Sequence, residues 1–171
     1  MVDVFLVRHA IAEPRDHERW PDDCQRPLSV GGIELFRQAA RGLRSLAIEV
    51  DAVLTSPCVR AVQTAQVLVE EAGWPIAESC EALEPTARAS AAERTLEARA
   101  EASLAVVGHQ PELAELASLL LTGDEQALAL ELKKGSVACI RFVGRPARNV
   151  GVLRWSVSPK FLRRLGQSAN D

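Results

Sequence analysis

Short apolar runs alternate with longer amphipathic stretches along most of this chain. The runs at residues 2–7, 51–56 and 103–109 have the length and the aliphatic content of buried strands. Helical spacing follows each run, and Gly, Pro or Ser residues punctuate the boundaries. Such alternation favours a parallel sheet with helices on both faces. We therefore predict an α/β protein with three α/β/α layers, a mostly parallel central sheet, and a single domain over residues 1–171.

The second half of the chain adds further elements to this pattern. Residues 90–102 should form a helix, because Ser90 and Glu93 have the spacing of a capping box. The runs 136–143 and 151–157 are typical of two strands separated by a Gly-Arg-Pro turn, and a short basic helix should follow near Phe161.

Composition and charge exclude several classes of protein. The net charge is −3, so no broad attraction to nucleic acid or to an anionic membrane is expected. No apolar run has the roughly 18 residues of a membrane span, and the start lacks the features of a secretory signal. The four cysteines are scattered without a C-x-x-C pair, which favours reduced thiols in a cytoplasmic protein over a disulfide framework or a zinc site. The oligomeric state stays open.

Polar side chains follow three of the predicted strands, at the point where each strand ends. Arg8 and His9 follow the first strand, Arg60 lies on the first turn after the second, and His109 follows the third. Ligands of such sheets bind beyond the carboxyl ends of the strands. Arginine forks and helix N-termini suit phosphate oxygens, so the sequence predicts a phosphate-binding pocket. A single histidine after a strand is more often structural, and the inference depends on the coincidence of three strand ends.

Three motifs occur in the order typical of one known family. "LVRHA", "LTSPCVRAVQTA" and "VVGHQPELAEL" resemble the histidine phosphatase superfamily, which has the phosphoglycerate-mutase-like fold. "RPLSVGG" and "WSVSPKFL" are similar to its small SixA-type phosphohistidine phosphatase branch. The resemblance implies that His9 is a nucleophile that becomes transiently phosphorylated. It also implies that Arg8, Arg60 and His109 bind the phosphoryl group, with no metal or other cofactor.

The chemistry of these side chains agrees with that assignment. A neutral imidazole can attack phosphorus in line and form a covalent intermediate. The cationic groups stabilise the charge on the equatorial oxygens. The family usually adds a carboxylate as general acid, and Glu84 is the nearest match, with Glu81 as the fallback and a surface glutamate as the alternative interpretation.

The substrate stays open between classes. The resemblance favours phosphohistidine on a protein, a small phosphate monoester is the second candidate, and a catalytically idle phosphoprotein-binding module is the third. Residues 139–145 also match the C-x5-R spacing of cysteine-dependent phosphatases, but their bulky side chains and the following proline argue against a phosphate loop.

Residues 11–28 are polar, contain three prolines and are expected to form a long loop. The loop is a solvated segment by default, and a mobile lip over the pocket is the alternative. Ser56 and Thr64 flank Arg60, where they could steady the pocket, cap a helix or simply pack.

Overall fold

The computed structural model describes residues 1–168 and contains one six-stranded sheet in the order β3-β2-β4-β1-β5-β6. β3, β2, β4 and β1 run parallel to one another. β5 runs antiparallel to β1, and β6 runs antiparallel to β5. This confirms the predicted α/β class with a mostly parallel sheet. The strands are β1 (Val2–Arg8), β2 (Ala52–Thr55), β3 (Glu78–Ser79), β4 (Ser103–Gly108), β5 (Val137–Phe142) and β6 (Val152–Val157).

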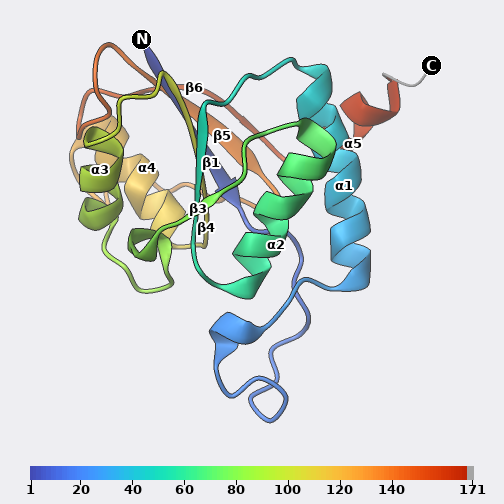
Figure 1. Cartoon of the computed structure of the whole chain (residues 1–171). Coiled ribbons are helices and arrows are strands. Elements are labelled where there is room, and N and C mark those ends of the chain that lie inside the picture. The colour runs from blue at the N-terminus through green and yellow to red at the C-terminus, as the bar shows by residue number, and fades with distance from the viewer. Residues whose placement is uncertain (169–171) are drawn as a thin grey trace.

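Helices cover both faces of this sheet, as predicted. Figure 1 shows α1, α2 and α5 on one side of the strands and α3 and α4 on the other. None of the helices within residues 1–168 combines the length and the apolar character that crossing a membrane requires. The helices are α1 (Val30–Ser45), α2 (Val59–Val67), α3 (Ala89–Glu97), α4 (Glu112–Thr122) and α5 (Pro159–Ser168), with a π-helical turn (Leu68–Ala72) after α2 and short 3-10 turns η1 (Asp23–Gln25) and η3 (Glu81–Leu83).

Strand β1 lies in the middle of the sheet, between β4 and β5. Phe5 and Val7 pack into the core under α1 and α2, whereas Val4 and Leu6 pack into the core under α3 and α4. A strand that is buried on both faces needs apolar side chains on both, which explains the unbroken run at its centre. β1 therefore holds its last residues rigidly at the carboxyl edge of the sheet.

The predicted capping box of α3 is wrong. The helix begins at Ala89 with Arg88 as its N-cap and ends at Glu97, so Ser90 lies inside the first turn and caps nothing. Glu93 is buried and accepts hydrogen bonds from the side chain and backbone of Arg148. A tertiary ion pair with a distant loop has replaced the local bond, and sequence spacing could not distinguish the two.

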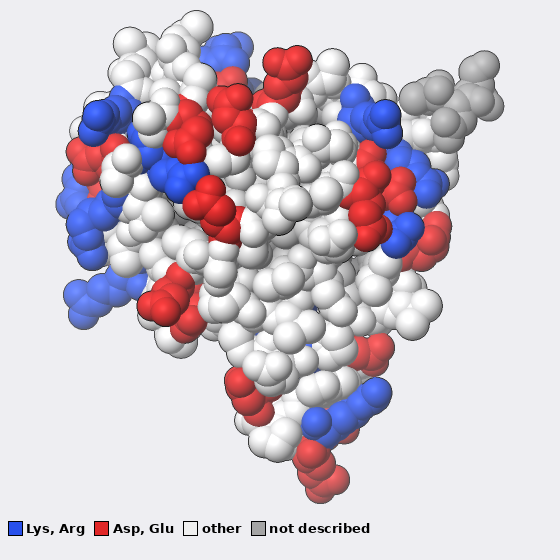
Figure 2. Space-filling view, in the orientation of Figure 1, with Lys and Arg blue, Asp and Glu red and all other residues white. Residues whose placement is uncertain are grey.

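The segment from residue 11 to residue 28 leaves the carboxyl edge of the sheet, as Figure 1 shows at the bottom of the molecule. Ala12 and Leu28 form an antiparallel bridge at its base, and η1 is its only helical turn among the described residues. Figure 2 shows acidic and basic side chains mixed over this face, including the projecting segment. The prediction of a long loop is confirmed.

Candidate active site

A cavity of about 670 Å³ opens at the carboxyl edge of the parallel strands. Arg8, His9, Arg60 and His109 all line it, so the structure brings together the four residues that the strand ends predicted. Its other lining residues are Ala12, Glu13, Pro14, Arg15, Asp23, Arg26, Pro85, Thr86, Gln110, Pro111, Glu112 and Lys134.

His9 follows β1 directly and is almost fully buried, with 6% of its surface exposed. Its Nδ1 atom lies 2.7 Å from the carbonyl oxygen of Ala10, which can only accept a hydrogen bond, so Nδ1 bears the proton. Burial lowers the pKa of His9 to about 3, and the charges of Arg60 and Arg8 act in the same direction. The ring is therefore neutral at pH 7, and its Nε2 lone pair is available for attack.

His109 follows β4, and its ring centroid lies 5.1 Å from that of His9. Its Nε2 atom is 2.9 Å from the hydroxyl oxygen of Ser56. Burial, together with the charges of His9 and Arg60, lowers its pKa to about 3. An incoming phosphate dianion would oppose these effects, because negative charge favours the imidazolium.

Two hydroxyl groups steady these residues. Besides the contact of Ser56 with His109, the Thr64 hydroxyl accepts a hydrogen bond from the Ala10 N–H at 3.0 Å. The same hydroxyl donates to the carbonyl oxygen of Arg60 at 2.7 Å. Thr64 thus ties the chain after His9 to the first turn of α2, so of the roles left open by the sequence, contact with the pocket residues is the one that the structure shows for both hydroxyls.

The two arginines are held by backbone oxygens. Arg8 Nη1 donates to the Leu132 carbonyl at 2.6 Å, and Arg60 Nη1 donates to the Asp23 carbonyl at 2.6 Å. Burial lowers the pKa of both guanidinium groups. Each guanidinium group is thus held in place by a hydrogen bond from its Nη1 atom.

Three buried nitrogen atoms of the four predicted site residues have no hydrogen-bond partner: Arg8 Nε, Arg60 Nε and His109 Nδ1. Buried polar groups are nearly always paired, and leaving one unpaired costs about 1–3 kcal/mol. Both guanidinium Nε atoms can only donate, so their missing partner is an acceptor. An oxyanion with several acceptor oxygens fits this requirement.

The sequence does not indicate that Lys134, Arg15 and Arg26 belong to the pocket, yet all three line it. Lys134 just precedes β5, and an antiparallel strand begins at the edge where its parallel neighbours end. Arg26 is buried in the loop, with its guanidinium on Asp23 and the carbonyl oxygen of Glu13.

The structure does not place Glu84 on the cavity. Glu84 is the C-cap of η3 and is absent from the lining residues, as is Glu81. The lining carboxylate of this region is Glu112, at the start of α4. Its Oε1 accepts the Thr86 N–H at 2.7 Å, and its Oε2 is buried without a partner.

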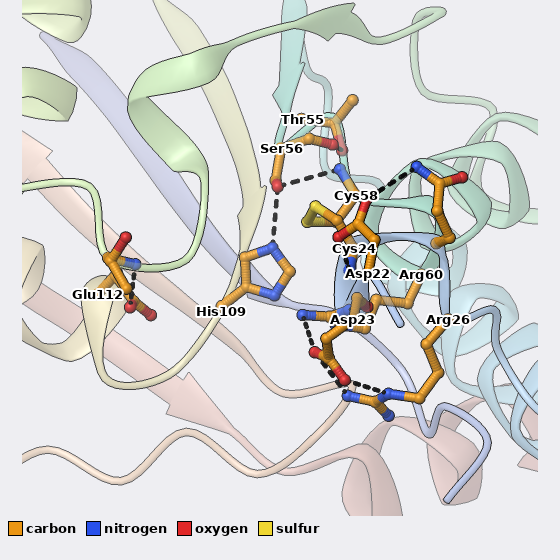
Figure 3. The surroundings of a disulfide bond; sticks show 12 residues. Asp22, Asp23, Cys24, Arg26, Thr55, Ser56, Cys58, Arg60, His109 and Glu112 are labelled. Atoms are coloured by element: carbon orange, nitrogen blue, oxygen red, sulfur yellow. Dashed lines mark hydrogen bonds and ion pairs between the residues drawn. A yellow bond between two sulfur atoms is a disulfide. The ribbon is translucent and has the colours of Figure 1, made fainter. Parts of the chain in front are cut away.

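The cysteine prediction is wrong for two of the four residues. Cys24 of η1 and Cys58, the N-cap of α2, form a disulfide with a Cα–Cα distance of 4.5 Å beside Arg60 (Figure 3). The path of the loop creates this contact across 34 residues, which no C-x-x-C spacing could signal. Cys80 and Cys139 are free thiols. Cys139 lies within β5, which confirms that residues 139–145 form a strand and turn instead of a phosphate loop.

Comparison with known proteins agrees with this geometry. The model of the histidine phosphatase superfamily (branch 1) matches residues 4–84. An uncharacterised protein of Picosynechococcus sp. (strain PCC 7002) is 32% identical over 82% of this chain and 85% of its own length. The chain belongs to the histidine phosphatase superfamily.

Within this superfamily the chain is similar to proteins of the SixA type. The phosphohistidine phosphatase SixA of Escherichia coli is 26% identical to this chain, and the match covers 95% of this chain and 97% of the SixA chain. The structure of the protein histidine phosphatase SixA complexed with tungstate superimposes with a TM-score of 0.81 at 26% identity, covering 94% of this chain and 99% of that one. The phosphoglycerate-mutase-like fold is thereby confirmed, and membership of the family supports a phosphatase activity.

Proposed function

We propose that this histidine phosphatase is a metal-independent enzyme that removes phosphate from phosphohistidine in a protein through a phosphohistidine intermediate on His9. The observation that supports this most directly is the arrangement around that ring. The neutral imidazole has an unprotonated Nε2, and the same cavity is lined by Arg8, Arg60 and His109, each of which has a buried nitrogen atom without a partner.

The reaction would proceed in two displacements. In the first, His9 Nε2 attacks phosphorus, an N–P bond forms, and the bond from phosphorus to the leaving group breaks. The Ala10 carbonyl stabilises the positive charge that develops on the ring through its bond to Nδ1–H. In the second, water attacks the same phosphorus and the N–P bond breaks. Inorganic phosphate leaves with both protons of the water, and the bonding pair returns to Nε2 of the now neutral His9.

The cationic groups would stabilise both transition states. The Nε atoms of Arg8 and Arg60 and the Nδ1 of His109 would donate hydrogen bonds to the equatorial phosphoryl oxygens. Because backbone carbonyls and Ser56 already fix these side chains, little reorganisation accompanies the reaction.

Two observations favour phosphohistidine over other substrates. The SixA relatives act on phosphohistidine by name, although they are only 26% identical to this chain. A protonated imidazole is also a good leaving group, so it needs less help from a general acid. A small phosphate monoester is the alternative substrate, and a phosphoprotein-binding module without turnover is the alternative function.

The decisive experiment compares turnover of a phosphohistidine protein, sugar phosphates and nucleotide monophosphates, each with and without EDTA. We expect the highest kcat/KM for the phosphohistidine protein and no effect of the chelator. His9→Ala should abolish turnover, whereas His17→Ala, in the exposed loop, should retain it. Activity that survives His9→Ala, or that EDTA removes, would contradict the mechanism.

Trapping the intermediate tests the nucleophile independently. Rapid denaturation during turnover should yield a phosphoprotein that is labile in acid and stable in alkali, as an N–P bond requires. A preference for sugar phosphates would identify the monoester alternative. Phosphate binding without any turnover would identify the binding module.

A further inference from the structure

The disulfide connects the loop over the cavity to the helix that presents Arg60. Cys24 lies in η1, whose residues are all at least partly exposed, and Cys58 is fully buried two residues before Arg60. Figure 3 shows this disulfide together with Asp23, the chain neighbour of Cys24, and Arg60, which follows Cys58 by two residues. The covalent bond therefore joins two elements that contribute side chains to the cavity.

Asp23, the neighbour of Cys24, holds the Arg60 guanidinium at two points. Its carbonyl oxygen accepts from Arg60 Nη1 at 2.6 Å, and its carboxylate lies 3.3 Å from Nη2. The same carboxylate accepts from Arg26 Nε at 2.8 Å and Nη2 at 3.2 Å. Hydrogen bonding from Arg26, opposed by burial and assisted by the charges of Arg26 and Arg60, lowers the pKa of Asp23, so the side chain is anionic.

These contacts leave Arg60 Nε buried and unpartnered. The η1 turn thus occupies the outer edge of the guanidinium and leaves the Nε edge for a ligand. Because the turn has only three residues and none of them is buried, few bonds hold it: those of Asp23 with Arg60 and Arg26, and the bond between Cys24 and Cys58. The Cys24–Cys58 bond is the covalent one among them.

We propose that Cys24 and Cys58 form a reversible redox site, whose disulfide holds the Asp23 turn against Arg60 and thereby raises the affinity of the cavity for phosphate. Reduction releases the turn, Arg60 loses its two contacts with Asp23, and the guanidinium must then be ordered by the ligand itself. The choice of phosphate as ligand rests on the proposed function.

The proposed reductant is a dithiol, which reduces the bond between Cys24 and Cys58 by thiol–disulfide exchange. A thiolate of the dithiol attacks the Sγ of Cys24, because Cys24 is a partly exposed residue, whereas Cys58 is fully buried. The S–S bond breaks, and Cys58 leaves as a thiolate at the N-terminus of α2, where the helix dipole stabilises it. The second thiol of the reductant then attacks the mixed disulfide and releases Cys24. Two electrons and two protons pass to the protein, and the dithiol becomes a disulfide.

The test uses inorganic phosphate as the ligand and the wild-type chain in both redox states. Free thiols are counted by mass spectrometry, folding is checked by circular dichroism, and the dissociation constant of phosphate is measured by calorimetry. We expect about tenfold weaker binding to the reduced protein. By linkage, saturating phosphate should lower the midpoint potential of the disulfide by about 30 mV, which is tenfold for two electrons.

Variants separate this pair from general effects of reductant. Cys24→Ser should bind phosphate as weakly as the reduced wild type and ignore the dithiol. Cys80→Ser removes a free thiol outside the pair and should keep the full redox response. Asp23→Asn should weaken phosphate binding in the oxidised protein, because the amide cannot form the ion pair with Arg60.

Equal phosphate affinity in the two states would overturn the proposal, as would tighter binding to the reduced protein, which would mean that Asp23 competes with phosphate. Absence of phosphate binding in both states would overturn it as well. Turnover measured in parallel distinguishes the proposed function. Redox-dependent phosphate binding without turnover would refute the phosphatase and leave the redox site standing, whereas turnover with equal affinities would do the reverse.

Discussion

The hydroxyl oxygen of Ser56 lies 2.9 Å from Nε2 of His109 and also accepts the backbone N–H of Cys58 at 3.3 Å. With a lone pair engaged by Cys58, the hydroxyl proton is free to point at the imidazole. We infer that Ser56 donates to Nε2, so that the neutral ring bears its proton on Nδ1. This is the nitrogen without a partner, and it can donate to a phosphoryl oxygen.

Substitution of Ser56 should therefore affect catalysis through His109. In Ser56→Ala the ring loses the bond that fixes its tautomer, and we expect kcat/KM to fall about tenfold, equivalent to about 1.4 kcal/mol. Steady-state kinetics with a phosphohistidine protein provide the measurement. Ser156→Ala, exposed on β6, is the control and should match the wild type. An unchanged kcat/KM in Ser56→Ala would contradict the assigned tautomer.

We expect that Glu112, and not Glu84, helps to protonate the leaving group. Glu112 lines the cavity and its buried Oε2 has no partner, whereas Glu84 is not among the lining residues. Glu112→Gln should slow the hydrolysis of alkyl phosphates, whose leaving groups need a proton, by about 10²-fold. It should have a much smaller effect on p-nitrophenyl phosphate. If Glu84→Gln gave the larger loss on alkyl phosphates, the original expectation for Glu84 would be restored.

Two adjacent glycines of α1 should respond oppositely to alanine. A Cβ on Gly32 would overlap the carbonyl oxygen of Ile11, two residues after His9, whereas a Cβ on Gly31 would meet nothing within 4 Å. Gly32→Ala should lower the free energy of unfolding by about 1–3 kcal/mol and reduce kcat/KM, because the chain after His9 must move. Gly31→Ala should raise that free energy by about 0.5–1 kcal/mol. Urea titrations of the two variants would measure the difference, and equal stabilities would show that α1 and Ile11 are not in close contact.

Acid should destabilise the protein through its buried histidines. Burial lowers the pKa of His9 and His109 from 6.5 to about 3, so between these values the unfolded chain binds more protons than the folded one. The contribution of these two histidines to the free energy of unfolding should therefore be fully present above about pH 6.5, and it should decrease as the pH falls toward 3. Lowered pKa values of carboxyls such as Asp23 add to this loss at the acid end.

The histidine contribution is isolated by substitution. In urea titrations between pH 7.5 and pH 4, His109→Asn should lose less stability on acidification than the wild type does. His17→Asn, in the exposed loop, serves as the control and should retain the wild-type slope. The same slope in all three proteins would mean that His109 is not neutral in the folded state.

The main elements and the four central site residues could be predicted from local pattern. An apolar run without alternation indicates a strand buried on both faces, and the residues that follow such strands in a parallel sheet meet at one edge. Arg8, His9, Arg60 and His109 lie where this rule places them. The family motifs contain the same four residues. The strand-end rule and the family resemblance therefore select the same site, and neither depends on the course of the loops.

The sequence by itself thus determined the sheet, the helices that cover it and the basic pocket at its edge, because strand and helix periodicity are local properties of the chain. Only the tertiary structure decided the antiparallel direction that brings Lys134 to the cavity, and that Glu112 and not Glu84 is among the residues lining it. It alone decided the pairing of Glu93 with Arg148 and the bond between Cys24 and Cys58. Each of these contacts depends on how a loop travels between distant elements, and no spacing of residues records that path.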